Sequence, residues 1–295
     1  MKRKIDYKIN ENDTGKTVEG FLKEHGYTHQ VLVRLKQTDH GILRNGIWAY
    51  TNERLCKDDL ITVQIVENEC SDNIAPVNLP LDIAYEDDDI IVINKPFDMP
   101  AHPSAGNHDN TLANALMYYY GSQNKPFVYR CINRLDRDTT GLTIVAKHAL
   151  AGGILGNAVA KRAIHRTYYA VCSGCTPACM RISAPIARKD ASTIERCVDF
   201  KRGENAVTDF IRIKYNPDNN LSLVKLRLLT GRTHQIRVHM KYIGFPLIGD
   251  FLYNPDYTYI SRQALHSGRL VFTHPVTGQK MNLISDIPSD MKSLF

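Results

Sequence analysis

The sequence lacks several features that define common protein classes. It has no run of about 18 apolar residues, so no membrane-spanning helix is expected. The basic N-terminus, Met1–Asp6, is followed by no apolar segment, which argues against a secretory signal peptide. Neither a Gly-x-Gly-x-x-Gly turn nor a P-loop is present. We therefore expect no nucleotide cofactor.

Cysteine is scarce, with seven residues in a chain of 295. A scattered, odd-numbered set is typical of reduced thiols, so the cytoplasm is the expected compartment. Cys172, Cys175 and Cys179 form a Cys-x-x-Cys-x-x-x-Cys run, but no fourth ligand follows at a zinc-binding spacing. We expect no metal here, and we expect Cys172 to end a strand.

Acidic residues are absent from two long stretches, Thr139–Lys189 and Asn219–Gly249. The first contains seven Lys or Arg residues and the second contains five. By contrast, nine acids and a single lysine lie between Glu67 and Asp98. A basic face opposite an acidic face orients a protein on a polyanion, so the pattern favours RNA as the partner.

One short segment between these stretches combines acids and arginines. Asp136 and Asp138 lie two residues apart, beside Arg134 and Arg137. A Thr-Thr-Gly turn follows, and then the apolar run Leu142–Ala146, which predicts a buried strand. Arginines within a few ångströms favour the charged form of a carboxylate. A charged, partly desolvated aspartate is a competent nucleophile, which makes Asp136 a candidate catalytic residue.

Residues 1–68 have the pattern of a small separate module. Helices are predicted to begin near Thr14 and Val31, from capping residues and apolar spacing. Ile42–Tyr50 predicts a hairpin with an Asn-Gly turn, and Leu60–Ile65 predicts a strand. A polar linker is expected over residues 69–80, and a larger domain over residues 81–295.

The larger domain is predicted to alternate strands and helices. The predicted strands are Tyr85–Asn94, Leu142–Ala146, Arg166–Cys172, Ala206–Tyr215 and Ser222–Leu229. Helices are predicted over Thr111–Tyr120 and His148–Lys161. This periodicity favours an α+β fold with a mixed sheet.

The run from Arg134 to Leu142, R-L-D-R-D-T-T-G-L, resembles the catalytic signature of the RluA-type family of RNA pseudouridine synthases. Further segments are similar to the family and follow its order: 81–87, 91–96, 102–103, 111–116, 230–239, 249–250, 262–266 and 274–275. The resemblance implies the pseudouridine synthase fold, a mixed, largely antiparallel sheet with flanking helices and a central RNA cleft. The first 68 residues resemble the ribosomal-protein-S-four-like RNA-binding module, a small α/β unit.

The resemblance also implies an activity: isomerisation of uridine to pseudouridine in structured RNA, by a monomer that needs no cofactor. Ribosomal RNA is favoured over transfer RNA as the partner. Asp136 matches the nucleophile, and Tyr168 matches a residue that stacks on the flipped uracil and helps to remove a proton. Arg232 matches the buried arginine that pairs with the nucleophile. The sequence leaves open attack on the base, attack on the sugar, and a glycal route.

Seven further residues are expected to contact RNA: His102, Arg134, Arg137, Arg166, His234, Gln235 and Arg237. His234 and Gln235 also fit a role as polar scaffolding, and Arg134 and Arg237 fit either phosphate contacts or structural contacts. Three positions depart from the family pattern. Asn133 replaces a histidine, Thr140 stands where a serine is commoner, and Asp98 stands where a glycine is common.

Two other functions are compatible with parts of the sequence. A catalytically silent RNA-binding or ribosome-assembly protein has the same fold, but binding alone requires no acid in a basic cleft. A glycosidase uses a pair of carboxylates, but Asp136 and Asp138 are too close in sequence to indicate the spacing across a substrate that it needs. Long basic stretches also serve no purpose with a neutral sugar.

Overall fold

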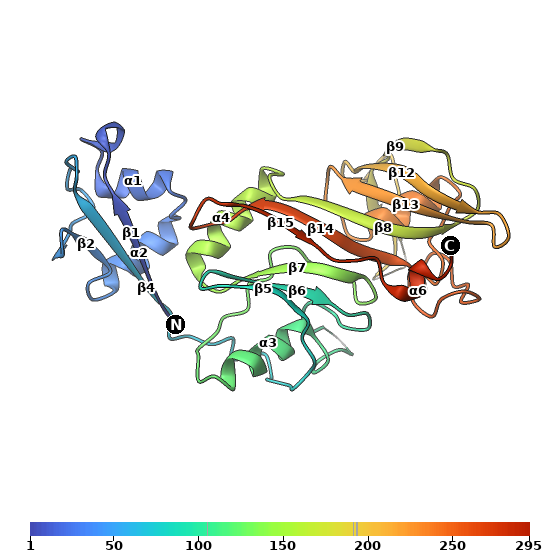
Figure 1. The fold of residues 1–295 in the computed structure, drawn as a ribbon, viewed down its shortest axis with the longest axis horizontal. Helices are drawn as coiled ribbons and strands as arrows, with labels where there is room; N and C mark the ends of the chain where they lie inside the picture. Colours follow the sequence, from blue (N-terminus) through green and yellow to red (C-terminus); the bar gives the residue numbers. More distant parts are fainter. Residues whose placement is uncertain (105, 191, 193) are drawn as a thin grey trace.

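The computed structural model describes residues 1–104, 106–190, 192 and 194–295. It contains a small N-terminal sheet with two helices and a nine-stranded sheet with helices on its faces (Figure 1). All but one of the strand pairs in the large sheet are antiparallel. The predicted α+β class with a mixed, largely antiparallel sheet is therefore confirmed. Among the described residues, no helix is long and apolar enough to cross a membrane.

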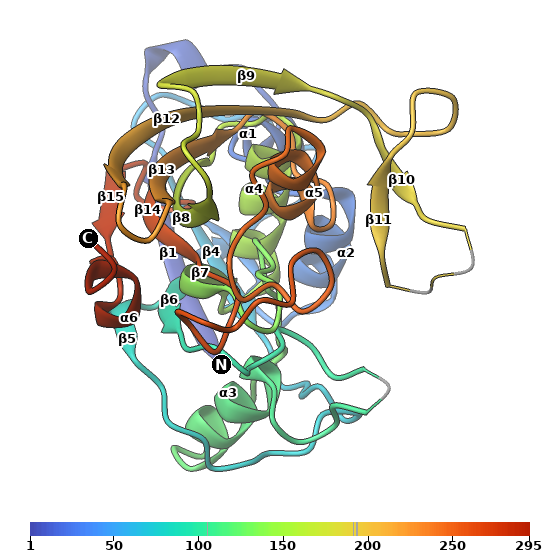
Figure 2. The same ribbon diagram turned by 90° about the vertical axis from the view of Figure 1, so that its right-hand side faces the viewer.

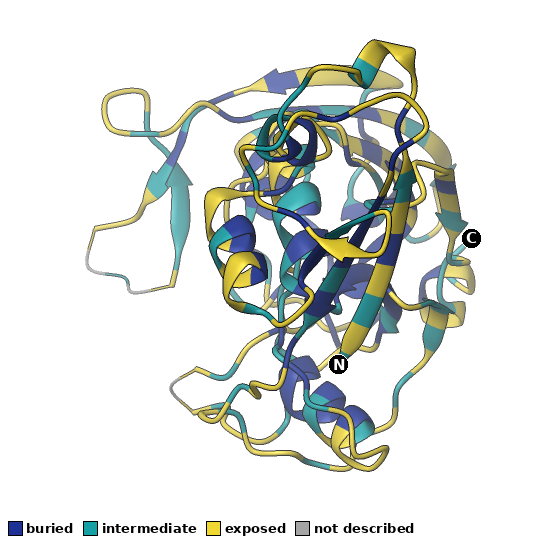
Figure 3. Cartoon of the chain, turned by 90° about the vertical axis from the view of Figure 1, so that its left-hand side faces the viewer, coloured by how far each residue is buried: buried dark blue, intermediate teal, exposed yellow. Residues whose placement is uncertain are grey.

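The N-terminal sheet has the strand order β1-β4-β2-β3. Its strands are β1 (Lys2–Lys8), β2 (Ile42–Arg44), β3 (Ile47–Trp48) and β4 (Leu60–Val66). A short 3-10 turn (Glu11–Asp13) precedes α1 (Val18–Glu24) and α2 (His29–Gln37). Each of these two helices buries three apolar residues at helical spacing, and its outer side is exposed (Figure 3).

The hairpin turn has the conformation that its sequence predicts. Asn45 and Gly46 both have positive φ, 53° and 85°, as a two-residue hairpin turn requires. The Asn45 side chain also donates to Asp59 at 2.8 Å and accepts from the backbone N–H of Leu60 at 2.8 Å. The turn is therefore tied to the start of β4.

The large sheet has the strand order β5-β6-β7-β14-β8-β13-β12-β9, and β15 pairs with β14 outside this path. Its strands are β5 (Ile83–Glu86), β6 (Ile90–Lys95), β7 (Thr140–Ala146), β8 (His165–Ser173), β9 (Cys179–Ser183), β12 (Val207–Asn216), β13 (Leu221–Leu228), β14 (Leu265–Thr273) and β15 (Lys280–Ile284). The helices are α3 (Leu112–Gly121), α4 (Ala149–Ala160), α5 (Gln235–Tyr242) and α6 (Ser289–Lys292). A hairpin of β10 (Ile186–Arg188) and β11 (Arg196–Val198) projects from the body (Figure 2).

The one parallel pair, β7 with β14, lies at the centre of the large sheet. Gly141 pairs with Ser267 there at φ 106°, and a Cβ on Gly141 would lie 2.3 Å from the Ser267 carbonyl oxygen. Only glycine fits this close approach. The Thr-Thr-Gly sequence therefore fixes the start of β7, and with it the loop that carries Asp136.

Helix α4 packs against both the N-terminal module and the large sheet. Leu150 near its N-terminal end is buried in the core of the N-terminal module, and Ile154 packs against the same core. Glu67 accepts hydrogen bonds from the Arg130 guanidinium at 2.9 Å and from the backbone N–H of Ala149 at 2.6 Å. The predicted linker, residues 69–80, contains no helix or strand.

A buried ion pair joins β1 to the turn between β5 and β6. Arg3 donates from Nε and Nη2 to the two carboxylate oxygens of Asp89, at 2.8 and 3.1 Å, and the Asp89 residue is 2% exposed. Arg3→Ala leaves this carboxylate with the hydrogen bond to His148 and a longer contact to His274, and it loosens the N-terminal module. We expect a loss of about 2 kcal/mol in the free energy of unfolding, measured by urea denaturation.

The matched control for this change is Lys4→Ala on the same strand. Lys4 pairs with Asp6 at 3.4 Å, but both side chains are exposed. An exposed pair contributes less than about 1 kcal/mol. Equal losses for the two variants would contradict a special role for Arg3.

Candidate active site

Asp136 lies on the loop before β7, and α5 brings an arginine against it. Nη1 of Arg237 donates to Oδ2 of Asp136 at 2.8 Å. Asp136 retains partial exposure, with 29% of its side chain accessible, whereas only 2% of the Arg237 side chain is accessible. In the described part of the chain no hydrogen bond to Oδ1 of Asp136 is recorded, so this oxygen is available to a substrate.

Arg237 is held from the other side by a second carboxylate. Its Nε and Nη2 donate to Asp250, at 2.7 and 2.8 Å, in a bidentate pair that is fully buried. The rings of Phe251 and Tyr253 lie 5.4 and 5.0 Å from the guanidinium carbon. Burial alone lowers the pKa of Arg237, but the two carboxylates outweigh it and raise that pKa. The guanidinium is therefore a fixed positive charge in a defined orientation.

The arginine that pairs with Asp136 is not the one predicted. Arg232 is exposed and its guanidinium pairs with Glu204 and with the carbonyl of Asn205. Helix α5 begins at Gln235, so Arg237 falls in its first turn, which faces the loop of Asp136. The prediction of Arg232 as the buried partner is wrong, and so is that of Arg237 as a direct RNA contact, because Arg237 is buried.

Gln235 also differs from its predicted role in RNA contact. Its side chain is buried and accepts from Thr230 and from the backbone N–H of Arg232, at 2.8 and 2.9 Å. It donates to the Val207 carbonyl and to Thr208, both at 3.0 Å. With all of these bonds made, Gln235 acts as scaffolding that ties the start of α5 to β12.

His234 immediately precedes α5 and lies beside the same carboxylate. Its Nε2 is 3.9 Å from Oδ2 of Asp136, and its Nδ1 is 3.0 Å from the hydroxyl of Tyr253. Burial lowers the pKa of His234 more than Asp136 raises it, so the imidazole is neutral. His234 has a positive φ of 56°, a costly conformation for a residue with a side chain.

Tyr168 and Tyr169 on β8 point to opposite faces, as strand geometry requires. Tyr168 belongs to the core cluster that contains Leu135 and Leu265, and it lines a small pocket with Asp136. Tyr169 instead packs with the cluster around Val171. The structure thus brings Tyr168, and not its neighbour, to the site of Asp136.

A cleft of about 1100 Å³ opens above Asp136. Of the lining residues that the structure describes, Asp136 is the single acid, and six are arginines: Arg134, Arg162, Arg166, Arg196, Arg227 and Arg232. His102 also lines this cleft. His102, Arg134 and Arg166, all predicted to contact RNA, therefore lie where a polyanion would be received.

Arg137 lies apart from that group. It is not among the residues that line the cleft, and its guanidinium pairs with Asp98, whose backbone has a positive φ of 55°. A glycine adopts this φ without strain. Position 98 is where the sequence departs from the family pattern by having an aspartate in place of that glycine. The ion pair holds the Arg137 guanidinium at Asp98, so the structure does not support the predicted contact of Arg137 with RNA.

Lys95 supports the loop that carries Asp136. The sequence alone did not indicate Lys95 as a site residue. Its buried ammonium donates to the carbonyls of Pro96, Met99 and Arg137, at 2.7, 2.8 and 2.9 Å. Burial lowers the pKa of Lys95 to about 7. Asn133 also holds the backbone near Asp136. Its side-chain N–H donates to the carbonyl of Leu142, and its side-chain oxygen accepts the backbone N–H of Ile144 in β7.

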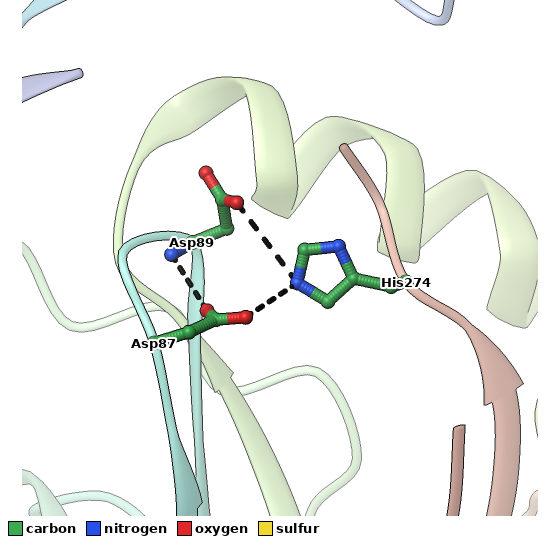
Figure 4. A group of neighbouring side chains, drawn as sticks. All are labelled: Asp87, Asp89 and His274. Carbon is green, nitrogen blue, oxygen red and sulfur yellow. Dashed lines mark hydrogen bonds and ion pairs between the residues drawn. The ribbon is translucent and has the colours of Figure 1, made fainter. Parts of the chain in front are cut away.

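One group of side chains has the composition of a metal site, and it lies at the junction of the two sheets. Asp87, Asp89 and His274 come together there (Figure 4). Nδ1 of His274 accepts the backbone N–H groups of Val276 and Thr277, so Nε2 carries the proton and faces Asp87 at 2.8 Å. This tautomer has no lone pair at Nε2 for a metal. The group instead places His274 against the turn that carries Asp89, the partner of Arg3.

A carboxylate held by a buried arginine, at the base of a cleft lined by cations, defines a protein that performs chemistry on a nucleic acid. Comparisons with known proteins identify the class. Residues 89–242 match the family model described as RNA pseudouridylate synthase. The chain belongs to this family, and within it to the RluA type. It is therefore an RNA pseudouridine synthase, an isomerase.

Curated relatives cover most of the chain. It is 38% identical to the Bacillus subtilis uncharacterized RNA pseudouridine synthase YjbO, over 95% of this chain and 98% of that protein. It is 41% identical to the Haemophilus influenzae ribosomal large subunit pseudouridine synthase D, over 78% and 75% of the two chains. The solved structure of human RNA pseudouridylate synthase domain containing 1 superposes with a TM-score of 0.59 at 26% identity, covering 70% of this chain and 83% of that one.

Two arginine variants test which guanidinium serves Asp136. Arg237→Lys keeps the charge but loses the geometry that holds Asp250 and Asp136 together, so we expect the maximal rate to fall about 100-fold, or about 3 kcal/mol. Arg232→Ala removes an exposed ion pair, a bond to the Asn205 carbonyl and one charge of the cleft, so it should weaken RNA binding but change the maximal rate less than about threefold. Rates would be measured on RNA from a strain that lacks the gene. The reverse ranking of the two variants would restore Arg232 as the partner.

Proposed function

We propose that this enzyme isomerises one or a few uridines in ribosomal RNA, with Asp136 as the nucleophile and Tyr168 against the flipped base. The observation that carries the proposal is the single acid at the base of the arginine-lined cleft. The relatives named as ribosomal large subunit pseudouridine synthases support ribosomal RNA as the substrate.

The reaction rearranges one nucleotide without gain or loss of atoms. The bond from the sugar to the glycosidic nitrogen breaks, the base turns, and a ring carbon joins the sugar. That carbon loses its proton, and the nitrogen ends with one. Base flipping must come first, because the glycosidic bond is not accessible in a stacked helix. Oδ1 of Asp136 has no hydrogen-bond partner among the described residues and is the oxygen we assign to the reaction, while Oδ2 stays on Arg237.

The surroundings of Asp136 fit the other steps. Tyr168 lines the small pocket beside Asp136 and offers a ring for the flipped uracil and a hydroxyl near the departing proton. Arg134 and Arg166, with His102, lie along the cleft at positions suited to phosphates. A catalytically silent RNA-binding protein would have no use for a buried ion pair that fixes one carboxylate oxygen.

Further proposals concern the compartment, the oligomeric state, the cofactor requirement and the domains of the enzyme. We propose that the enzyme works in the cytoplasm as a monomer without cofactor or metal, and that transfer RNA is a secondary candidate substrate. Residues 1–68 are proposed as an S-four-like RNA-binding module, residues 69–80 as a linker and residues 81–295 as the catalytic domain. The fold of residues 2–66, with two helices on a four-stranded sheet of their own, supports a separate module whose core is completed by Leu150 of α4.

The decisive change is Asp136→Asn, which keeps the size of the side chain and removes its charge. We expect loss of all detectable activity with RNA affinity retained within about threefold. The measurement is carbodiimide labelling and mass spectrometry of RNA from a strain that lacks the gene, complemented with wild type or variant. An active Asp136→Asn variant would refute the proposed nucleophile. No missing pseudouridine in the strain, with RNA binding intact, would support the silent RNA-binding protein instead.

Arg166 tests the cleft as the RNA surface. Arg166→Gln keeps most of the side chain length and removes one charge from the cleft. We expect RNA affinity to fall and the slope of log affinity against log salt to decrease by about 0.7 to 0.9, as for one lost phosphate contact. Arg269→Gln is the control, because Arg269 on β14 contacts Asn282 and is not among the residues lining the cleft. Equal slopes for the two variants would place the RNA elsewhere.

A further inference from the structure

Tyr253 contacts both groups that surround Oδ2 of Asp136. Its ring lies 5.0 Å from the guanidinium carbon of Arg237, and its hydroxyl lies 3.0 Å from Nδ1 of His234. Its backbone N–H donates to Asp250 at 3.2 Å. The residue is only 5% exposed, so these contacts are made away from bulk water.

The hydrogen bonds of Tyr253 determine which nitrogen of His234 carries the proton. The hydroxyl oxygen accepts the backbone N–H of Arg196 at 2.9 Å. For the hydroxyl hydrogen, the described residues offer one recorded acceptor, Nδ1 of His234. Because burial keeps the imidazole neutral, Nδ1 is the acceptor and the proton resides on Nε2. Nε2–H is then the group that faces Oδ2 of Asp136, at 3.9 Å.

We propose that Tyr253 is a positioning residue for this reaction, which fixes His234 as the Nε2–H tautomer and thereby holds the orientation of Asp136. In the opposite tautomer a lone pair on Nε2 would face the lone pairs of Oδ2, and the carboxylate would turn away from it. The N–H instead favours Oδ2 on the side of Arg237 and His234, and leaves Oδ1 free of these two groups. This inference rests on the proposed role of Asp136.

The same hydroxyl links the projecting hairpin to the site. Arg196 begins β11, and its backbone N–H is the group that the Tyr253 oxygen accepts. Arg196 also lines the RNA cleft. A displacement of this hairpin would therefore change the hydrogen bonding of Tyr253 and, through it, the proton position on His234.

The test uses Tyr253→Phe in the full-length protein, which keeps the ring over Arg237 and removes only the hydroxyl. Tyr120→Phe is the matched control, because Tyr120 is also buried and its hydroxyl donates to Glu86 at 2.9 Å. Rates are measured in single turnover with enzyme in excess over RNA from the strain lacking the gene. We expect Tyr253→Phe to lower the maximal rate about tenfold without changing the half-saturating concentration, and Tyr120→Phe to leave both unchanged.

Two readouts separate positioning from general support of the fold. Long-range proton–nitrogen NMR spectra, with His234 assigned by its loss in His234→Ala, should show protonated Nε2 in the wild type and a mixture of tautomers in Tyr253→Phe. In a His234→Ala background, Tyr253→Phe should cause no further loss of rate.

Other results would overturn the proposal: a wild-type His234 protonated on Nδ1, an unchanged tautomer in Tyr253→Phe, or an equal loss of rate in both backgrounds. A raised half-saturating concentration with an unchanged maximal rate would also overturn it, and would assign Tyr253 to RNA binding. The tautomer is read without any turnover, so failure of Asp136 as the nucleophile would be distinguished from failure of this inference.

Discussion

The buried ion pair between Arg237 and Asp250 is the constraint on which the site depends. Burying a guanidinium is costly unless a carboxylate of matched geometry accompanies it, and Asp250 supplies that carboxylate in bidentate form. Two of the three guanidinium nitrogens are thereby occupied, and the remaining one reaches Asp136. One oxygen of Asp136, the proposed nucleophile, is thus held by a pair of residues on α5 and the loop after it.

The rest of the site is arranged around that pair. Phe251 and Tyr253 follow Asp250 directly and cover the guanidinium, so the loop that supplies the counter-charge also excludes water from it. On the opposite side, Lys95 and Asn133 fix the backbone on either side of Asp136 by bonding to carbonyls and an N–H group. The Asp136 carboxylate can therefore move only by rotation about its own side-chain bonds, and its Oδ2 is held by Arg237.

Local sequence patterns predicted most strands and helices and the position of Asp136. Long-range contacts decided the features that the sequence did not predict. Asp136 was identifiable because its turn and the apolar strand after it are contiguous in sequence. Strand β1 was missed because six of its seven side chains are polar or aromatic and only Ile5 is buried. Arg232 and Arg237 occur in one motif, and no local feature distinguishes them. What decides between them is the start of α5 after His234, and a partner 13 residues further on.

Helix α4 has one end in the core of the N-terminal module and the other at the rim of the RNA cleft. Its 12 residues span about 18 Å along the helix axis. An RNA that touches both the N-terminal module and the cleft must present its two contact points at a matching separation. If residues 1–68 bind RNA as proposed, the fixed length of this helix would restrict the uridines that reach the cleft to those in RNA of a matching three-dimensional shape.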